Sequence, residues 1–150
     1  MHGPIVSRKE RLVLVLVISI DPGDSHVGYA EWESGKLINY AKHSPATLIK
    51  ELESKAPGSV KTVVVEAFRL YPWLAQQQGF SALKTPQLIG VIKYLSNYLG
   101  ADLVEQGANI KKPAFAAMAS EGFELPKTNQ HVRDAIAHGW WYYYNRKKEN

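Results

Sequence analysis

The sequence predicts a mixed α/β fold, in which a five-stranded sheet is flanked by helices. Two apolar runs rich in β-branched residues, Leu12–Ile20 and Val60–Glu66, are typical of buried strands. In the second half of the chain, such runs alternate with segments whose apolar residues recur at helical spacing, which is the pattern of crossover connections. Glycine and proline residues separate these segments and set most of their boundaries.

The first half of the chain is expected to contain most of the sheet. The dipeptide Ser34-Gly35 stands between two alternating segments and predicts a hairpin turn. Residues 45–55 predict a short amphipathic helix, which a stretch containing proline and glycine separates from the next strand. The strands expected here cover residues 11–20, 27–33, 36–42 and 60–66.

The second half is expected to be mostly helical. Residues 67–84, rich in aromatic and glutamine side chains, are expected to form a loop. Thr85 is expected to cap a helix with Pro86 at its first position and Gly100 just past its end, because proline suits the first turn and glycine the end. The other elements are a strand at 102–105, a helix at 111–120 and a helix from an Asn129 cap to about Tyr144. The resulting order is β-β-β-α-β-α-β-α-α, an antiparallel meander followed by crossover helices.

Composition predicts one globular domain with a polyanionic partner. The expected parts are a basic tail at 1–10, a domain at 11–145 and a second basic tail at 146–150. The absence of cysteine excludes disulfides and thiolate zinc sites. The run Leu12–Ile20 is too short to span a bilayer. The residues after it, Asp21-Pro22, make a poor cleavage site for a signal peptide. We therefore expect a cytoplasmic protein without a membrane partner. The formal net charge of +4 favours a polyanion.

Three carboxylates and a histidine lie on separate expected elements that could converge on one sheet. Asp21 follows the first strand at a turn with Gly23, and Glu66 ends another apolar strand. His131 and Asp134 stand three residues apart in the last helix. Magnesium prefers such oxygen ligands, and paired magnesium ions promote phosphodiester hydrolysis. The set therefore points to a divalent-metal site.

Helical spacing gives the last helix two distinct faces. The apolar stripe consists of Val132, Ala135, Ile136, Gly139, Trp140 and Tyr143. His131, Asp134 and His138 share a separate face of the helix. The alternative to a metal site on this face is an ordinary solvated surface with no catalytic role. His138 is expected to lie at the surface or beside the ligands rather than to be a ligand. The acids expected outside the site are Asp24 in a turn, Glu31 and Glu33 on an exposed strand face, and Asp102 and Glu105 beside a strand.

This set of residues, in this order, resembles the RuvC-type Holliday-junction resolvases of the RNase H-like superfamily. The resemblance covers roughly residues 12–143 and depends on Ile20-Asp21-Pro22-Gly23, Gly28-Tyr29, Glu66 and His131-x-x-Asp134. It implies an RNase H-like fold and a magnesium-dependent endonuclease that resolves four-way junctions during DNA recombination and repair. The compact length is similar to that of phage-encoded resolvases, so a bacterial or phage-infected cell is the expected host.

The resemblance also implies a role for each site residue. Asp21 would bridge two Mg²⁺ ions, for which Mn²⁺ can substitute, while Glu66 binds one ion and Asp134 the other. His131 would be a ligand or an aid to water activation. Most relatives carry an acid at that position, which leaves the role of the histidine open between these two.

DNA contacts are implied at two places. Phe68, Arg69 and Tyr71 would meet the distorted centre of the junction, although packing within their loop is the alternative for the aromatic rings. Lys111 or Lys112 would approach the scissile phosphate, with a solvated lysine pair as the alternative.

The resemblance further implies a homodimer that forms through the helix at 86–99, where Tyr94 and Tyr98 lie. The monomer's own core explains the apolar stripe of that helix equally well. Two other functions stay open: an RNase H-like nuclease acting on RNA, flaps or other branched DNA, and a non-catalytic DNA-binding module. Asp21-x-Gly23 also resembles the phosphate-binding turn of actin-like ATPases, which need two such domains.

Overall fold

A mixed five-stranded sheet forms the centre of the molecule, as the sequence predicted. The computed structural model describes residues 16–23, 25–67 and 72–149. The strands are β1 (Leu16–Asp21), β2 (Val27–Glu33), β3 (Lys36–His43), β4 (Val60–Glu66) and β5 (Asp102–Gln106). The helices are α2 (Pro45–Glu53), α3 (Pro72–Leu99), α4 (Lys111–Ser120) and α5 (Gln130–Glu149), with a short 3₁₀ turn at Ala108–Ile110. None of the described helices is both long and apolar enough to cross a membrane.

The strand order β3-β2-β1-β4-β5 places two carboxyl ends side by side at the middle of the sheet. Strand β2 pairs antiparallel with both β1 and β3, so the three strands form two successive hairpins. The first hairpin, β1–β2, places Gly28 opposite Asp21. Strand β1 runs parallel to β4, with Ile20 opposite Val65, and β4 runs parallel to β5. Asp21 and Glu66 therefore leave the sheet at the same edge, one on each of two neighbouring strands.

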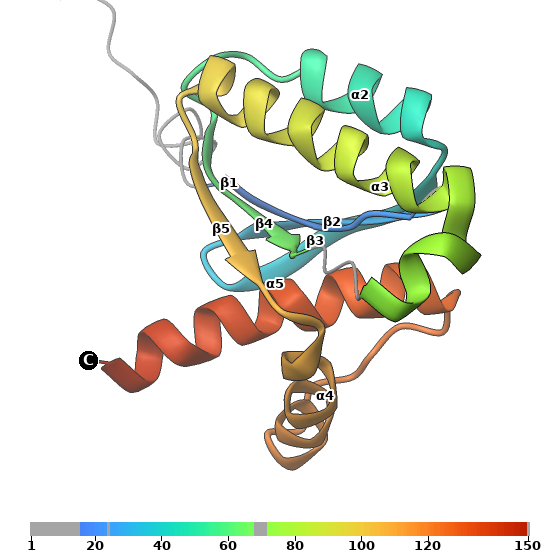
Figure 1. The fold of residues 1–150 in the computed structure, drawn as a ribbon. Coiled ribbons are helices and arrows are strands. Elements are labelled where there is room, and N and C mark those ends of the chain that lie inside the picture. The colour runs from blue at the N-terminus through green and yellow to red at the C-terminus, as the bar shows by residue number, and fades with distance from the viewer. Residues whose placement is uncertain (1–15, 24, 68–71, 150) are drawn as a thin grey trace, which may run out of the picture.

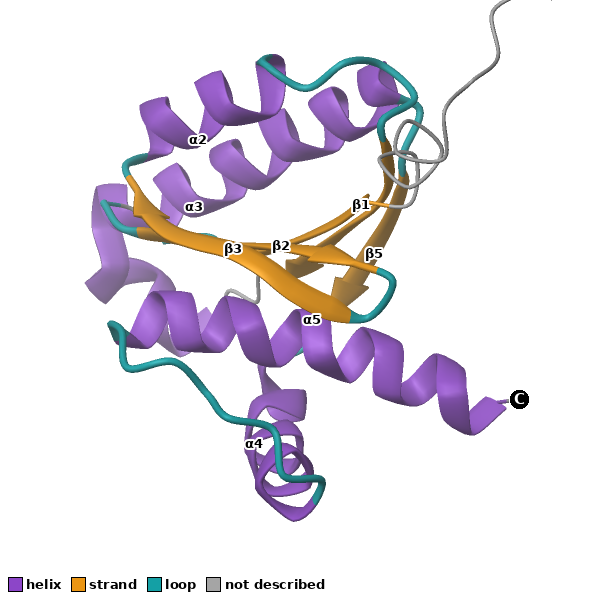
Figure 2. Cartoon of the chain, turned by 180° about the vertical axis from the view of Figure 1, so that it is seen from behind, coloured by secondary structure: helices purple, strands orange, loops and turns teal. Residues whose placement is uncertain are grey.

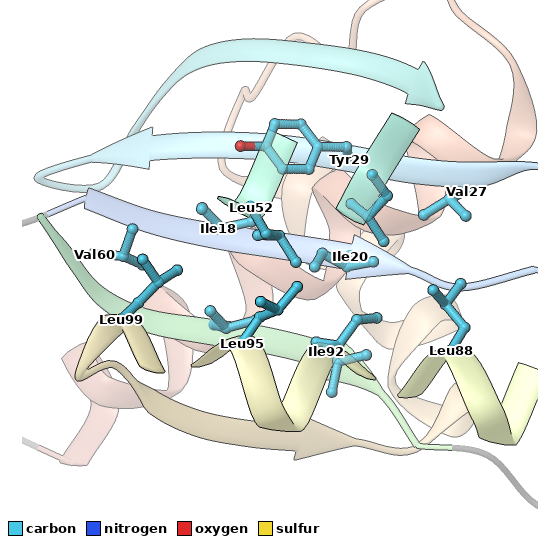
Figure 3. Close-up of a cluster of buried hydrophobic side chains, with 13 residues drawn as sticks. Ile18, Ile20, Val27, Tyr29, Leu52, Val60, Leu88, Ile92, Leu95 and Leu99 are labelled. Atoms are coloured by element: carbon cyan, nitrogen blue, oxygen red, sulfur yellow. The ribbon is translucent and has the colours of Figure 1, made fainter. Parts of the chain in front are cut away.

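Helices cover both faces of the sheet. Helices α2 and α3 lie on one face and α5 on the other, with α4 beyond α5 (Figures 1 and 2). On the first face, Leu88, Ile92, Leu95 and Leu99 of α3 pack against β1 and β4 (Figure 3). This stripe was expected from helical spacing, and its burial supplies the non-directional stabilisation of the fold.

Helix α5 lies unusually close to the sheet because its middle carries a glycine. A Cβ atom on Gly139 would lie 2.1 Å from Nε1 of Trp32 and 2.7 Å from Oγ of Ser19. The Trp32 Nε1 donates a hydrogen bond of 3.0 Å to Ser19 Oγ beneath this glycine. The apolar stripe of α5, with buried Val132 and Ile136, completes the core on this face.

Helix α3 differs from the sequence prediction. The segment 67–84 was expected to be a loop, but α3 begins at Pro72, and Pro86 lies inside the helix rather than at its first position. A proline inside a helix removes one backbone hydrogen bond and bends the helix, but the turns on both sides persist. Figure 1 shows a bend between the green N-terminal part of α3 and its yellow part. Helix α5 also continues to Glu149, into the stretch expected to be a tail.

Glu31 was expected on an exposed strand face, which is wrong. Its side chain is buried beneath α2, where Lys55 Nζ lies 2.7 Å from Oε2 and the Tyr29 hydroxyl donates to the same oxygen at 2.5 Å. Burial acts to raise the pKa of Glu31, but the hydrogen bonds from Lys55 and Tyr29 outweigh it and lower the pKa. The helix over this end of the sheet therefore covers a strand face that alternation alone predicts to be solvated.

Replacing Glu31 with glutamine should lower the free energy of unfolding at neutral pH by about 2 kcal/mol, because the partly buried Lys55 then keeps only its longer contact of 3.5 Å with Glu51. Since the folded pKa of Glu31 is lowered, its stabilisation is present above the unfolded pKa and is lost as pH falls through the folded value. Urea unfolding across pH 3–7 measures the difference. Glu105→Gln, which breaks an exposed pair with Lys93, is the control with a smaller change. A difference that persists undiminished at the acidic end would contradict this account.

Candidate active site

The site lies where β1 and β4 end, against the first turns of α5. Asp21 is buried at 5% exposure, and Glu66 is partly exposed beside it on the neighbouring strand. The Oδ2 atom of Asp21 is 3.3 Å from Nδ1 of His131. Asp134 is 8% exposed and faces the same edge of the sheet. Three elements that are far apart in the sequence thus bring these four side chains together.

The first turn of α5 is held in place from two sides. The Oδ1 atom of Asn129 accepts a hydrogen bond of 3.1 Å from the backbone N–H of Val132, so Asn129 caps the helix as expected. Gly28 of β2 touches the helix from the sheet, because a Cβ atom there would lie 1.8 Å from the carbonyl oxygen of His131. Gln130 Nε2 donates to Oδ1 of Asp134 at 2.6 Å. These contacts fix the height of His131 and Asp134 above the sheet.

The structure separates the two lysines that the sequence left equivalent. Lys111 opens α4 and extends its ammonium between two carboxylates, 3.0 Å from Oε1 of Glu66 and 3.4 Å from Oδ2 of Asp134. Burial acts to lower the pKa of Lys111, but Glu66, Asp134 and Asp21 outweigh it and raise the pKa. Lys112 is exposed. Only Lys111 of this pair therefore lies within the carboxylate cluster.

The carboxylates hold more negative charge than Lys111 neutralises. Burial, repulsion by Glu66 and Asp134, and a hydrogen bond with Glu66 raise the pKa of Asp21 to about 8. Burial acts to raise the pKa of Glu66 too, but hydrogen bonds from His138 and Lys111 lower it. Either protonation of Asp21 or a bound cation would relieve this repulsion.

The donor chemistry fits a divalent cation. Carboxylate oxygens of Asp21, Glu66 and Asp134 come from three elements, and hard oxygen ligands of this kind suit Mg²⁺ and Mn²⁺. Among the described residues, no three His, Asp or Glu side chains already form a compact metal-binding group. The Lys111 ammonium lies between Glu66 and Asp134 instead, so these two carboxylates could share a metal only if Lys111 moved.

A pair of residues that the sequence analysis identified only in part lies behind Glu66. Of the two places expected for His138, the structure has the one beside the ligands: the side chain is fully buried, and its Nε2 lies 3.0 Å from Oε1 of Glu66. Gln106, the last residue of β5, contacts both the ring and the backbone carbonyl of His138. The spacing of His138 from His131 and Asp134 was a usable signal for its position on the same helix face. Nothing in the sequence singled out Gln106.

The other residues expected to contact DNA are not among the residues that the structure describes. Phe68, Arg69 and Tyr71 lie outside the described residues, as does Asp24. They stay predictions of the sequence.

Two solved structures share this architecture. The structure of RuvC from Thermus thermophilus aligns with a TM-score of 0.69 and 18% identity, over 90% of this chain and 97% of that one. T. thermophilus RuvC in complex with a Holliday junction substrate aligns with a TM-score of 0.66 and 18% identity, over 89% of this chain and 96% of that one. No family model and no curated protein matches the sequence. The chain therefore has the RNase H-like fold of RuvC, which confirms the resemblance at the level of the fold.

Proposed function

We propose that the chain is a magnesium-dependent, structure-selective endonuclease that resolves Holliday junctions. One observation carries the proposal: β1, β4 and α5 bring Asp21, Glu66 and Asp134 together at a buried place, where burial and repulsion by Glu66 and Asp134 raise the pKa of Asp21 to about 8. Such mutual repulsion is unfavourable unless a cation is bound, and it is common where carboxylates hold catalytic metals. The similarity in fold to a RuvC solved with a Holliday junction substrate supports branched DNA as the proposed substrate class.

Each residue of the cluster has a proposed part in hydrolysis. Asp21, Glu66 and Asp134 would hold two Mg²⁺ ions, with Mn²⁺ as a substitute. Bound metal supplies an acidified water and neutralises charge on the phosphate. His131, 3.3 Å from Asp21, would complete the ligand set or orient the attacking water. Lys111 would exchange its contacts with Glu66 and Asp134 for the scissile phosphate, since its ammonium is already at the site.

Further contacts would hold the branched DNA around this centre. Phe68, Arg69 and Tyr71 are proposed to meet the junction centre, and exposed Lys112 to contact the phosphate backbone. A homodimer through α3 would supply two sites for paired cuts. Tyr94 and Tyr98 on that helix are 69% and 57% exposed, which leaves their rings available for a helix-helix contact.

The purified protein should be incubated with a mobile four-way junction, a matched duplex and an RNA/DNA hybrid, each with and without Mg²⁺. Paired nicks in the junction that require Mg²⁺ are the expected result. Cleavage confined to the hybrid would assign the site to a ribonuclease instead. Tight junction binding without cleavage under any metal condition would identify a DNA-binding module.

The two lysines should respond differently to substitution by methionine. Lys111→Met is expected to slow junction cleavage by roughly 100-fold, because it removes a cation from the cluster, a loss of about 2.7 kcal/mol in transition-state stabilisation. Lys112→Met should leave the cleavage rate of bound junction unchanged but weaken binding and reduce the salt dependence of affinity by about one phosphate contact. Single-turnover cleavage and binding at several salt concentrations measure the two effects. Equal cleavage rates in the two variants would remove Lys111 from the mechanism.

His131 should be replaceable by a carboxylate. His131→Ala is expected to lose most of the activity, roughly 100-fold, and His131→Asp to recover much of it, because carboxylate oxygen suits magnesium better than imidazole. His26, whose ring centroid lies 6.0 Å from that of His131, is exposed and supplies the control variant His26→Ala. Initial cleavage rates at saturating Mg²⁺ measure the series. Near-normal turnover of His131→Ala would make the histidine a bystander.

A further inference from the structure

We propose that His138 and Gln106 form a buried relay that positions the Glu66 carboxylate for metal binding. The inference rests on the proposed function, since it concerns how one of the proposed ligands is held. His138 and Gln106 would be positioning residues, because they contact Glu66 or each other rather than the metal or the DNA.

The relay begins with a histidine that has no access to solvent. His138 lies one turn beyond Asp134 on α5, is 0% exposed, and directs Nε2 at Oε1 of Glu66 over 3.0 Å. Because the carboxylate can only accept, Nε2 carries the hydrogen of this bond. A polar ring at a fully buried position is unfavourable unless its hydrogen bonds are made. The contact with Glu66 is therefore a reason for a histidine at this position.

Gln106 fixes the ring from the opposite side. It is paired with Glu66 across β4 and β5, so the two side chains begin from adjacent positions of the sheet. Its Nε2 donates to the backbone carbonyl of His138 at 3.2 Å, and its Oε1 lies 3.3 Å from Nδ1 of the ring, a contact in which Oε1 accepts when Nδ1 also carries a hydrogen. These two contacts leave the imidazole little freedom to rotate. The three residues thus connect β5, α5 and β4 through the side-chain contacts of His138.

The relay determines which oxygen of Glu66 remains for a metal. Both His138 Nε2 and Lys111 Nζ contact the same atom, Oε1, each at 3.0 Å. The two donors hold the carboxylate in one rotamer. The other oxygen, Oε2, carries no contact with His138 or Lys111 and would turn to the metal, which would replace the hydrogen bond between Glu66 and Asp21. Hydrogen bonds that orient a metal ligand in this way typically contribute 10–100-fold to metal affinity.

Two nearly isosteric substitutions test the relay. The amide nitrogen of His138→Gln can reach the position of imidazole Nε2, whereas that of His138→Asn reaches only the position of Nδ1. Mn²⁺ binding, measured by calorimetry without DNA, should weaken by roughly 10–100-fold in His138→Asn and by much less in His138→Gln. Gln106→Leu should weaken Mn²⁺ binding to an intermediate extent, because the ring stays but is no longer fixed.

A matched control separates positioning from packing. Thr62 Oγ1 contacts the hydroxyl of Tyr142 at 3.3 Å, also between β4 and α5 but away from the carboxylates. Thr62→Val should lower the melting temperature without changing Mn²⁺ affinity. Equal Mn²⁺ affinity in wild type and His138→Asn, or equal loss in His138→Asn and His138→Gln, would overturn the relay. Failure of the wild-type protein to bind Mn²⁺ at all would instead overturn the proposed metal site.

Discussion

Asp21→Asn is expected to slow metal-dependent cleavage of a four-way junction by roughly 1,000-fold or more, which corresponds to about 4 kcal/mol of transition-state stabilisation. The substitution keeps the shape of the side chain but removes the charge proposed to bridge the metals. Junction binding should stay within about twofold in the presence of Ca²⁺, because the basic surface that contacts phosphates is unchanged. Single-turnover cleavage in Mg²⁺ and binding in Ca²⁺ measure the two quantities separately.

The same variant should be at least as stable as the wild type in the absence of metal. Because the folded pKa of Asp21 is raised from 3.8 to about 8, ionisation of Asp21 destabilises the fold progressively as pH rises between these values. Asparagine has no such ionisation, so its advantage in free energy of unfolding should grow from pH 4 to pH 8. Loss of cleavage together with gained stability would exclude unfolding as the cause of inactivity.

Substitutions of other acidic residues provide comparisons for Asp21→Asn. Glu66→Gln and Asp134→Asn should each slow cleavage about as much as Asp21→Asn does. The variant that combines Glu66→Gln and Asp134→Asn should cleave little more slowly than either single variant, because the effects of residues that act as a unit are not additive. Asp102 begins β5 and is exposed, so Asp102→Asn is a control that should cleave normally. Nicking by Asp21→Asn at the wild-type rate would remove Asp21 from the site.

The parts of the structure that follow from local pattern were predictable. The apolar runs that form β1 and β4 end at Asp21 and Glu66, and neighbouring parallel strands necessarily bring such ends together. The Asn129 cap and the apolar stripe of α5 then fix which face of that helix carries Asp134. Local signals of this kind are sufficient because each depends on only a few adjacent residues.

The parts that depend on distant contacts were not predictable. Glu31 is buried because Lys55, from the end of α2, reaches over the sheet to it. Gln106 acquires its position beside His138 only once β5 pairs with β4 and α5 crosses them. The N-terminal half of α3 was missed because its composition lacks a clear apolar stripe and Pro86 suggested a helix start. In each case tertiary packing outweighs the local preference.

Gly28, which the sequence analysis named only as part of the Gly28-Tyr29 motif, lies directly against the backbone of α5. A Cβ atom at Gly28 would lie 1.8 Å from the carbonyl oxygen of His131, 2.2 Å from its carbonyl carbon and 2.8 Å from the backbone nitrogen of Val132. All three atoms belong to the backbone of α5, so no flexible side chain can move aside. An added methyl group must therefore displace the first turn of α5 from the sheet.

Gly28→Ala is accordingly expected to lower the free energy of unfolding by about 3 kcal/mol or more, and the melting temperature by roughly 10 °C. Cleavage at a temperature where the variant is still folded should also fall, by roughly 100-fold, because His131 and Asp134 move with the helix relative to Asp21. Gly90→Ala is the control for stability: a Cβ atom on this residue of α3 would meet nothing within 4 Å, so alanine should stabilise the helix by about 0.5–1 kcal/mol. Thermal unfolding and single-turnover cleavage on both variants test the pair. A Gly28→Ala protein with the stability and rate of the wild type would show that α5 is not held at this contact.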